Sequence, residues 1–172
     1  MSDDIKKKID VVFIAGGKFH DIDFARLEIL KLLAEDDRMK TRVFEDYSNL
    51  HAIENADFLI TYTCDVRPTL EQQKALKKYV ASGKRWLALH GTNSILQFMS
   101  DGKVDSPRIA PIMMETLGSQ FIAHPPIEPY NVRVSQPDHP LVEGVEEFET
   151  TDELYLMELH GDLDVLLEAD YD

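Results

Sequence analysis

The chain contains very little cysteine. Cys64 is the only cysteine among 172 residues. A single thiol excludes an internal disulfide and any zinc site built from several cysteines. The sequence also contains no internal repeat and no low-complexity segment. Because disulfides mark oxidising compartments, their absence favours a cytoplasmic protein.

Long apolar runs and excess positive charge are also absent. No apolar stretch approaches the roughly 20 residues that a membrane span needs. Residues 1–8 are charged and contain no apolar segment, so we expect no secretory signal. The chain has 18 basic and 32 acidic residues, with a formal net charge of −14. This balance argues against nucleic acid and anionic membranes as partners, but it leaves a neutral small molecule such as a sugar open.

Three short apolar runs each end abruptly in polar residues. They cover residues 11–15, 58–63 and 85–89, and patterns typical of helices separate them. Such runs are typical of parallel strands covered on both faces. Their alternation with helices predicts an α/β fold with a doubly wound, mainly parallel sheet and helices on both faces. The length of 172 residues and the lack of a linker predict one domain.

The element boundaries follow from periodicity and capping signals. Thr69 and Gln72 fit a capping box, and Gly83 stands where the helix after Thr69 would end. In the helix expected over 22–36, Phe24 and Leu30 are placed on one apolar face. The predicted strands cover 9–15, 40–44, 57–63, 85–90, 130–135, 154–159 and 163–167, and the predicted helices cover 22–36, 49–56, 69–82 and 107–117, with a hairpin turn at 160–162.

The polar residues that follow the strands are the first candidates for a functional site. In a parallel sheet the carboxyl ends of the strands share one edge, and ligands bind there. We therefore expect the residues directly after three of the strands to converge: His20, Asp21, Cys64, Asp65, His90, Thr92 and Asn93.

His90 and Gly91 stand where a hydrolase would carry its nucleophile elbow. Serine or cysteine is missing there, so an acyl-enzyme is disfavoured, and a metal ligand or a general base is more natural. The alternative is a histidine that only hydrogen-bonds the following turn. His20 beside Asp21 can likewise act as base, acid or metal ligand.

Two other patterns carry less weight. Gly16 and Gly17 precede Lys18, but Phe19 follows where a phosphate loop needs serine or threonine, so a sharp glycine turn is favoured. Cys64 is a rival nucleophile, although single cysteines are more often buried apolar residues.

The second half of the chain adds further polar candidates. His124 precedes two prolines, which would hold it in place, unless it is a solvated residue in a turn. Asp152 and Glu153 could cap a helix, bind hydroxyls or complete a metal site. A divalent metal such as zinc is compatible with the candidate ligands His20, His90 and His124, although no fixed-spacing ligand pair indicates one.

Several dispersed motifs resemble those of the ThuA-like trehalose-utilisation family. They occur in the expected order: His20-Asp21, Cys64 to Thr69, Ala88 to Asn93, Gly118 to Phe121, His124 to Pro126, His139 to Leu141 and Asp152 to Tyr155. The resemblance implies a flavodoxin-like fold related to class I glutamine amidotransferases, with His90 in or near the position of the lost cysteine. It also implies that related chains continue beyond residue 172, so we expect this sheet to lack a C-terminal strand.

The resemblance further implies a role in sugar catabolism, often beside oxidoreductases that make 3-keto-glycosides. We expect a lyase, isomerase or hydrolase acting on a keto-sugar or glycoside, with a sugar as its partner; a homo-oligomer is compatible with the sequence. The alternatives are a non-catalytic sugar-binding or assembly subunit and a hydrolase or amidotransferase relic that uses Cys64. The expected catalytic residues are His90, His20 and Glu153, and the expected substrate-binding residues are Asp21, Asp65, Thr92, Asn93, His124 and Asp152.

Overall fold

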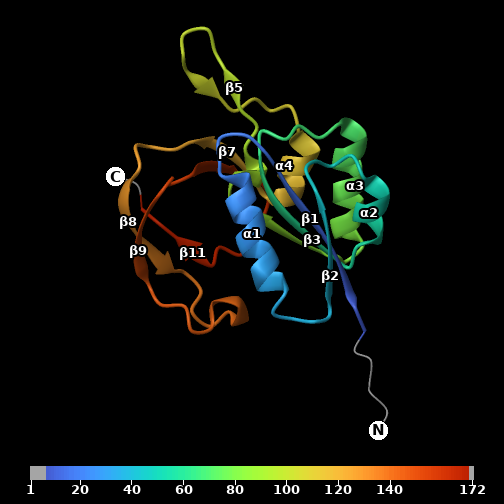
Figure 1. Ribbon diagram of the computed structural model, residues 1–172. Coiled ribbons are helices and arrows are strands. Elements are labelled where there is room, and N and C mark those ends of the chain that lie inside the picture. Colours follow the sequence, from blue (N-terminus) through green and yellow to red (C-terminus); the bar gives the residue numbers. More distant parts are fainter. Residues whose placement is uncertain (1–6, 171–172) are drawn as a thin grey trace.

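A four-stranded parallel sheet lies at the centre of the structure, a computed structural model that describes residues 7–170 (Figure 1). The strand order is β2-β1-β3-β4, with the chain reversing its direction of travel across the sheet at β1. This order is that of the flavodoxin-like fold. The strands are β1 (Ile9–Gly17), β2 (Met39–Phe44), β3 (Phe58–Cys64) and β4 (Arg85–Leu89).

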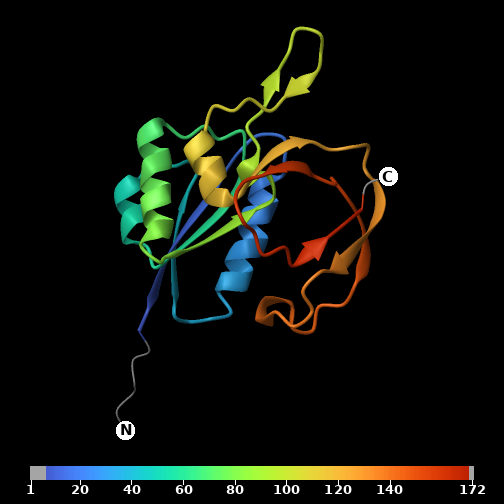
Figure 2. The ribbon, with the colours of Figure 1, turned by 180° about the vertical axis from the view of Figure 1, so that it is seen from behind.

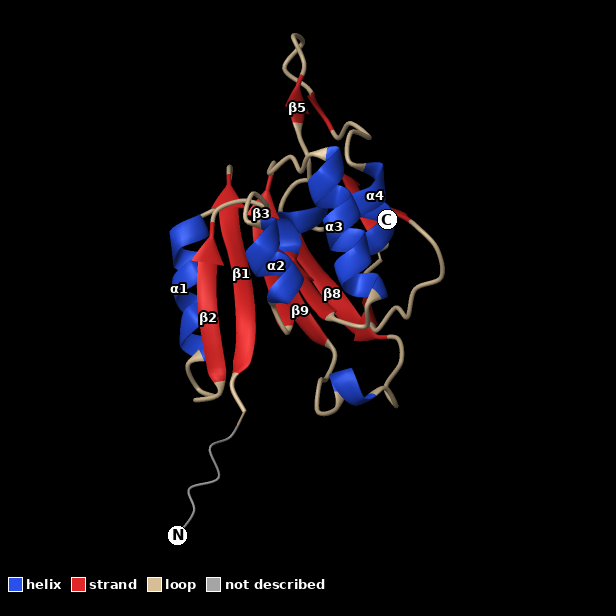
Figure 3. Ribbon diagram, turned by 90° about the vertical axis from the view of Figure 1, so that its right-hand side faces the viewer, coloured by secondary structure: helices blue, strands red, loops and turns tan. Residues whose placement is uncertain are grey.

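Helices cover both faces of this sheet, as the sequence predicts (Figure 3). Alternate residues of β1 point to opposite faces. Val11 and Phe13 belong to the cluster that packs against α1, whereas Val12 and Ile14 belong to the larger cluster on the other face. One face carries α1 (Ile22–Leu33), and the other carries α2 (Leu50–Asn55), α3 (Leu70–Ala81) and α4 (Pro111–Leu117).

The capping signals are confirmed at the start of α3. The Thr69 hydroxyl accepts a hydrogen bond from the Gln72 amide, and the Thr69 amide donates to the Gln72 side chain. The prediction that Phe24 and Leu30 share the buried face of α1 is confirmed only for Leu30. Leu30 packs against the sheet, but Phe24 is 62% exposed and lines a cavity instead. This helix ends at Leu33, three residues before the predicted boundary.

The second half of the chain adds β structure on one side of the sheet (Figure 2). An antiparallel hairpin of β5 (Gln97–Phe98) and β6 (Val104–Asp105) projects from the body as an arm (Figure 1). Two further groups of antiparallel strands follow. They are β7 (Ser119–Ala123) with β10 (Leu156–Leu159), and β8 (Glu128–Val134) with β9 (Phe148–Asp152) and β11 (Leu167–Glu168); the short 3-10 helices η1 (His90–Asn93) and η2 (Pro140–Val142) complete the set.

Four sequence-based predictions fail. The strand expected over 163–167 is one of them, because β11 covers only Leu167–Glu168. The hairpin at 160–162 is wrong, because β10 pairs with β7 while β11 pairs with β8. The last helix begins at Pro111 rather than residue 107, since proline is suited to the first helical position. β4 is not covered on both faces: it is the last strand of the sheet, and Leu87 is 45% exposed. No helix within residues 7–170 is both long and apolar enough to cross a membrane.

The end of β1 provides a test of backbone packing. Gly17 has a φ of 110°, and a Cβ there would lie 1.9 Å from the Cys64 carbonyl oxygen. Gly83 also has a positive φ, of 85°, but a Cβ there would meet no described atom within 4 Å. Gly83→Ala should therefore cost only the conformational term of about 1–2 kcal/mol. Gly17→Ala should cost more than about 4 kcal/mol in urea unfolding, or fail to fold. Equal losses in the two variants would contradict the close contact.

Candidate functional site

Three strained turns meet at the carboxyl edge of the sheet. Phe19, Asp65 and His90 follow β1, β3 and β4, and their φ angles are 72°, 56° and 47°. Side chains other than glycine rarely adopt this region, and such strain tends to collect at functional sites. The strained turns therefore mark this edge as a candidate functional site, and the sequence places its candidate residues at the same edge.

His90 occupies a sharp turn between a strand and a short helix. β4 ends at Leu89, and η1 begins at His90 itself. The next residue must be small, since a Cβ on Gly91 would lie 2.9 Å from the Thr63 carbonyl oxygen. The predicted elbow geometry is therefore present, with an imidazole in the position of the nucleophile.

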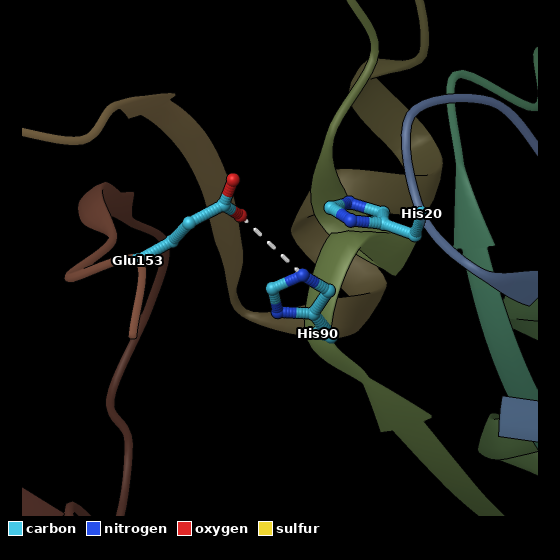
Figure 4. A group of neighbouring side chains, drawn as sticks. All are labelled: His20, His90 and Glu153. Carbon is cyan, nitrogen blue, oxygen red and sulfur yellow. Dashed lines mark ion pairs between the residues drawn. The ribbon is translucent and has the colours of Figure 1, made fainter. Parts of the chain in front are cut away.

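His20, His90 and Glu153 form a cluster at this edge (Figure 4). Each offers one ligand atom, and these three atoms all lie within 4.8 Å of one another. The closest ionic contact joins His90 Nε2 and Glu153 Oε2 at 3.4 Å. The rings of His20 and His90 meet edge to face with centroids 4.4 Å apart. His90 and Glu153 lie 70 and 133 positions after His20 in the sequence, and the fold brings all three side chains together.

His124 extends the cluster beyond Glu153. Its Nε2 lies 3.7 Å from Glu153 Oε1, and its Nδ1 lies 2.8 Å from the Pro125 carbonyl oxygen. Because a carbonyl oxygen only accepts hydrogen bonds, Nδ1 is the donor and carries a proton. This bond fixes the ring, so that Nε2 faces the Glu153 carboxylate. His124 does not belong to the group of three close ligand atoms.

Two tyrosines flank the His90 ring. The Tyr155 ring stacks on His90 with centroids 4.9 Å apart, and its hydroxyl lies 3.3 Å from His90 Nε2. Tyr62 stacks on His90 at 5.8 Å. Burial raises the pKa of both tyrosines above the ordinary value, with nearby carboxylates adding to the shift. Both hydroxyls are therefore protonated at neutral pH and can act as hydrogen-bond donors.

The pKa of His20 is lowered. Burial is the main cause, and the neighbouring His90 adds to it, while Glu153 and Asp152 act in the opposite direction. A lowered pKa keeps the imidazole neutral at pH 7. A neutral imidazole can accept a proton or bind a metal ion.

Cys64 is buried, as the sequence analysis favours. Burial raises the pKa of its thiol to about 11, and Asp65 and Glu153 contribute to the same shift. A thiol with this pKa is almost entirely protonated at neutral pH. Cys64 lines the same cavity as His20 and Glu153, but a protonated thiol does not favour the alternative in which Cys64 is a nucleophile.

Asp65 and Thr92 hold the turns together, and neither lines the two larger cavities beside the cluster. The Asp65 carboxylate is only 4% exposed and contacts Lys18, Arg67 and the Leu96 amide. The Thr92 hydroxyl is buried and donates toward the Leu89 carbonyl oxygen at 2.8 Å. The structure thus commits the polar atoms of both side chains to internal contacts, which does not favour the expected role in binding substrate hydroxyls.

Asn93 also points inward. Its amide nitrogen donates to the Ser119 hydroxyl at 2.9 Å, and its buried Oδ1 has no hydrogen-bond partner among the described residues. Asn93 lines a small cavity of about 100 Å³ next to His90 and Thr92. It therefore lies beneath the cluster rather than on its open side.

Two larger cavities open on either side of the cluster. The first, here called the aromatic cavity, has a volume of about 370 Å³. The second, here called the carboxylate cavity, has a volume of about 590 Å³ and contains the expected binding residues Asp21 and Asp152. His20 and Glu153 line both. Asp21 uses one oxygen to cap α1, and Asp152 uses one to accept from the Glu153 amide.

Sequence reasoning did not identify the aromatic wall of the site. Tyr155, Phe98 and Phe121 line the aromatic cavity, and Phe121 packs against Tyr155 with ring centroids 4.5 Å apart. Phe121 and Tyr155 end two of the family motifs quoted above, and those motifs are the signal that could have indicated them. Phe98 reaches the cavity only through the fold of the arm, and no local pattern predicts that position.

Comparison with known proteins agrees with this architecture. A family model described as ThuA, trehalose utilisation, matches residues 10–172. The chain belongs to the ThuA family. This membership confirms the resemblance found in the sequence and supports a role in carbohydrate utilisation.

Solved structures of ThuA-like proteins share the fold. One from Bacteroides uniformis superimposes with a TM-score of 0.75 at 18% identity, and the match covers 96% of this chain and 69% of the Bacteroides uniformis chain. One from Parabacteroides merdae gives a TM-score of 0.65 at 17% identity, and the match covers 96% of this chain and 70% of the Parabacteroides merdae chain. No curated protein matches the chain.

The internal contacts of Asp65 predict a pH-dependent stability. Burial raises the pKa of this carboxyl, but hydrogen bonds from Lys18, Leu96 and Arg67 outweigh that effect and lower it below 3.8. A carboxyl with a lowered folded pKa stabilises the protein above its unfolded pKa, and this stability is lost as the pH falls through the folded value. Asp65→Asn should therefore cost about 2 kcal/mol at pH 7, and the difference from wild type should shrink below about pH 4.

Urea unfolding between pH 3 and pH 7 measures this difference. Glu115→Gln is the matched control, because Glu115 pairs with Lys77 on the surface and both side chains are more than half exposed. The control should change stability by less than about 0.5 kcal/mol at any pH. A loss of stability in Asp65→Asn that stays constant down to pH 3 would contradict the stabilising role of the ionised Asp65 carboxylate.

Proposed function

We propose that this ThuA-family protein is an enzyme that acts on a keto-sugar or keto-glycoside at the cluster of His20, His90 and Glu153. The observation that carries the proposal is the convergence of two imidazoles and a carboxylate, from three distant segments, at the ligand-binding edge of the sheet. The family's role in carbohydrate utilisation supports a sugar as the substrate.

The donor set suits a divalent metal ion. Catalytic zinc sites use three protein ligands and keep one position open, and two histidines with one carboxylate are also typical of other divalent metals. The three ligand atoms come within 4.8 Å of one another, so small side-chain movements would bring them around one ion. His20 and Glu153 also line both cavities, which leaves the cluster accessible to substrate.

The predicted chemistry is proton transfer beside the sugar carbonyl. A bound divalent ion would polarise the carbonyl group. His124 is placed to move the proton, because the bond between Nδ1 and the Pro125 carbonyl oxygen orients its ring beside Glu153. Tyr155 supplies a protonated hydroxyl next to His90.

Removal of a proton from the carbon beside the carbonyl sends its electron pair to the carbonyl oxygen. In the enediolate so formed, the neighbouring hydroxyl can lose its proton and become the new carbonyl, while the former carbonyl carbon and its oxygen each take up a proton, which isomerises the sugar. Alternatively, the ketone reforms, a double bond forms between the deprotonated carbon and the next carbon, and the bond from that next carbon to the leaving group breaks, with the leaving group taking a proton as it departs. The first outcome is an isomerase reaction, and the second is a lyase reaction on a glycoside.

Metal titration of the purified protein tests the proposal. We expect calorimetry with Zn²⁺ or Mn²⁺ to give about one ion per chain. His90→Ala should weaken that binding by at least about 100-fold and lower the turnover of 3-ketotrehalose or a 3-keto-glucoside by at least about 100-fold. His51→Ala is the control, because His51 lies exposed on α2 and, within residues 7–170, its ring forms a hydrogen bond with Asn55 alone.

Each other result has a defined meaning. Turnover without metal binding, still lost in His90→Ala, would assign proton transfer to the histidines alone. Stabilisation by sugars without any product would indicate a non-catalytic binding protein. Undiminished turnover in His90→Ala would refute the proposed site.

A further inference from the structure

We propose that Asn93 is a positioning residue for His90, and that a water molecule in the small cavity beneath the cluster bridges Asn93 Oδ1 and His90 Nδ1. This inference rests on the proposed function, because it concerns how the His90 ring is held for metal binding. The bridge itself is a feature of the fold, and it can be detected whether or not the protein binds a metal ion.

Stacking fixes the plane of the His90 ring but not its orientation within that plane. Tyr62 and Tyr155 both stack on the ring, at interplanar angles of 22° and 27°. A half-turn of the imidazole about its bond to Cβ keeps the same plane, so the stacking contacts hardly distinguish the two orientations. The half-turn exchanges nitrogen and carbon at the edge of the ring. Hydrogen bonds at that edge therefore decide which orientation the ring adopts.

Only one of the two His90 ring nitrogens has a partner within residues 7–170. Nε2 lies 3.4 Å from Glu153 Oε2 and 3.3 Å from the Tyr155 hydroxyl, and no described residue hydrogen-bonds Nδ1. Figure 4 shows this second nitrogen on the edge of the ring away from Glu153. When Nε2 binds a metal ion, Nδ1 carries the proton and donates it to a carboxylate, a carbonyl or water. His90 thus has a donor that needs an acceptor.

Asn93 carries the matching acceptor. Its side chain is only 8% exposed, and its buried Oδ1 has no hydrogen-bond partner among the described residues. Its Nδ2 donates to the Ser119 hydroxyl at 2.9 Å and lies 3.4 Å from the Met157 sulfur. Because a thioether sulfur can only accept, the amide nitrogen and not the oxygen belongs on that side. A buried carbonyl oxygen without a donor is unfavourable, so Oδ1 needs a donor from elsewhere.

The backbone places the two unpaired groups on one side of η1. His90 and Asn93 are the first and last residues of this four-residue 3-10 helix. Side chains three positions apart in a 3-10 helix eclipse each other. Both residues line the small cavity of about 100 Å³. One water molecule needs about 10–15 Å³ of such space and two or more polar partners, so the cavity has room for it.

A water molecule in this cavity pairs both groups at once. It accepts a hydrogen bond from His90 Nδ1 and donates one to Asn93 Oδ1. A bond through an ordered water is enthalpically nearly as good as a direct one. The bridge therefore favours the ring orientation in which Nε2 faces Glu153. Asn93 acts on the metal site through His90 and touches neither the metal ion nor the substrate.

A crystal structure of the metal-free wild-type protein, at a resolution that shows ordered water, tests the bridge directly. We expect one water molecule within about 3.2 Å of both Asn93 Oδ1 and His90 Nδ1. A cavity without that water, or a different donor on Oδ1, would overturn the inference. Neither result depends on whether the protein binds a metal ion or a sugar.

Zn²⁺ titration of variants by calorimetry tests the positioning role. Asn93→Leu has a similar shape but no acceptor, so it should weaken Zn²⁺ binding by about 10- to 100-fold. Asn93→Asp keeps an acceptor oxygen and should bind Zn²⁺ at least as tightly as the wild type. Met157→Leu is the matched control, because it removes the sulfur contact of the Asn93 amide and Met157 does not line the small cavity. The control should leave the affinity unchanged.

The outcomes separate this inference from the proposed function. A wild-type protein that binds no divalent ion would contradict the proposed metal site, and the crystal structure alone would then decide the bridge. Unchanged Zn²⁺ affinity in Asn93→Leu, beside a wild type that binds the ion, would overturn the positioning role. Equal losses in Asn93→Leu and Met157→Leu, or in Asn93→Leu and Asn93→Asp, would show that Asn93 only supports the packing of β10.

Discussion

The turns that follow β1, β3 and β4 are packed so closely that backbone atoms, and not side chains, set their spacing. Gly17 leaves no room for a Cβ beside the Cys64 carbonyl oxygen, and Gly91 leaves almost none beside Thr63. Backbone hydrogen bonds from Lys18 to Cys64 and from Asp65 to Ser94 join the same turns. Since His20 and His90 are carried by these turns, their ring contact depends on this spacing. A shift of one turn would separate the two imidazoles.

The buried Asp65 carboxylate extends this constraint to the aromatic cavity. Asp65 accepts a hydrogen bond from the Leu96 amide, and Arg67, which contacts Asp65, donates to the Leu96 carbonyl oxygen at 2.6 Å. Both backbone groups of Leu96 are thereby fixed two residues before Phe98. One buried charge thus positions the base of the arm, because an ionised carboxylate in this place requires its cationic partners. The role of Asp65 lies in placing the wall of the cavity.

The sequence predicts the parts of the molecule that depend on local periodicity. The runs of β1 and β3 and the capping box of Thr69 with Gln72 are local patterns, and the structure places them where they are expected. The convergence of His20 and His90 is also predictable, since it follows from the parallel sheet alone. Contacts between the sheet and the second half of the chain are different. Glu153 was a candidate only from its neighbours in sequence and the family motifs.

The errors have a common physical origin. Asp65 has the same local context as a ligand-binding carboxylate, and only the positions of Lys18 and Leu96 in space show that it is enclosed. β4 has the composition of a covered strand, yet the strands that follow pair with one another rather than with it. Tyr155 and Phe98 reach the site through long-range packing that short-range patterns do not encode. Contacts between residues far apart in the sequence therefore limit how much of the site can be predicted from local patterns.

The boundary between the two cavities suggests why the ionisable groups lie where they do. A carboxylate and two imidazoles need polar surroundings to remain hydrated or paired, whereas proton transfer is favoured where water is partly excluded. Glu153 is in contact with His90 and His124 and lines both cavities. A substrate bound at the cluster would displace water from it while leaving Glu153 in contact with both imidazoles, and this combination favours proton transfer.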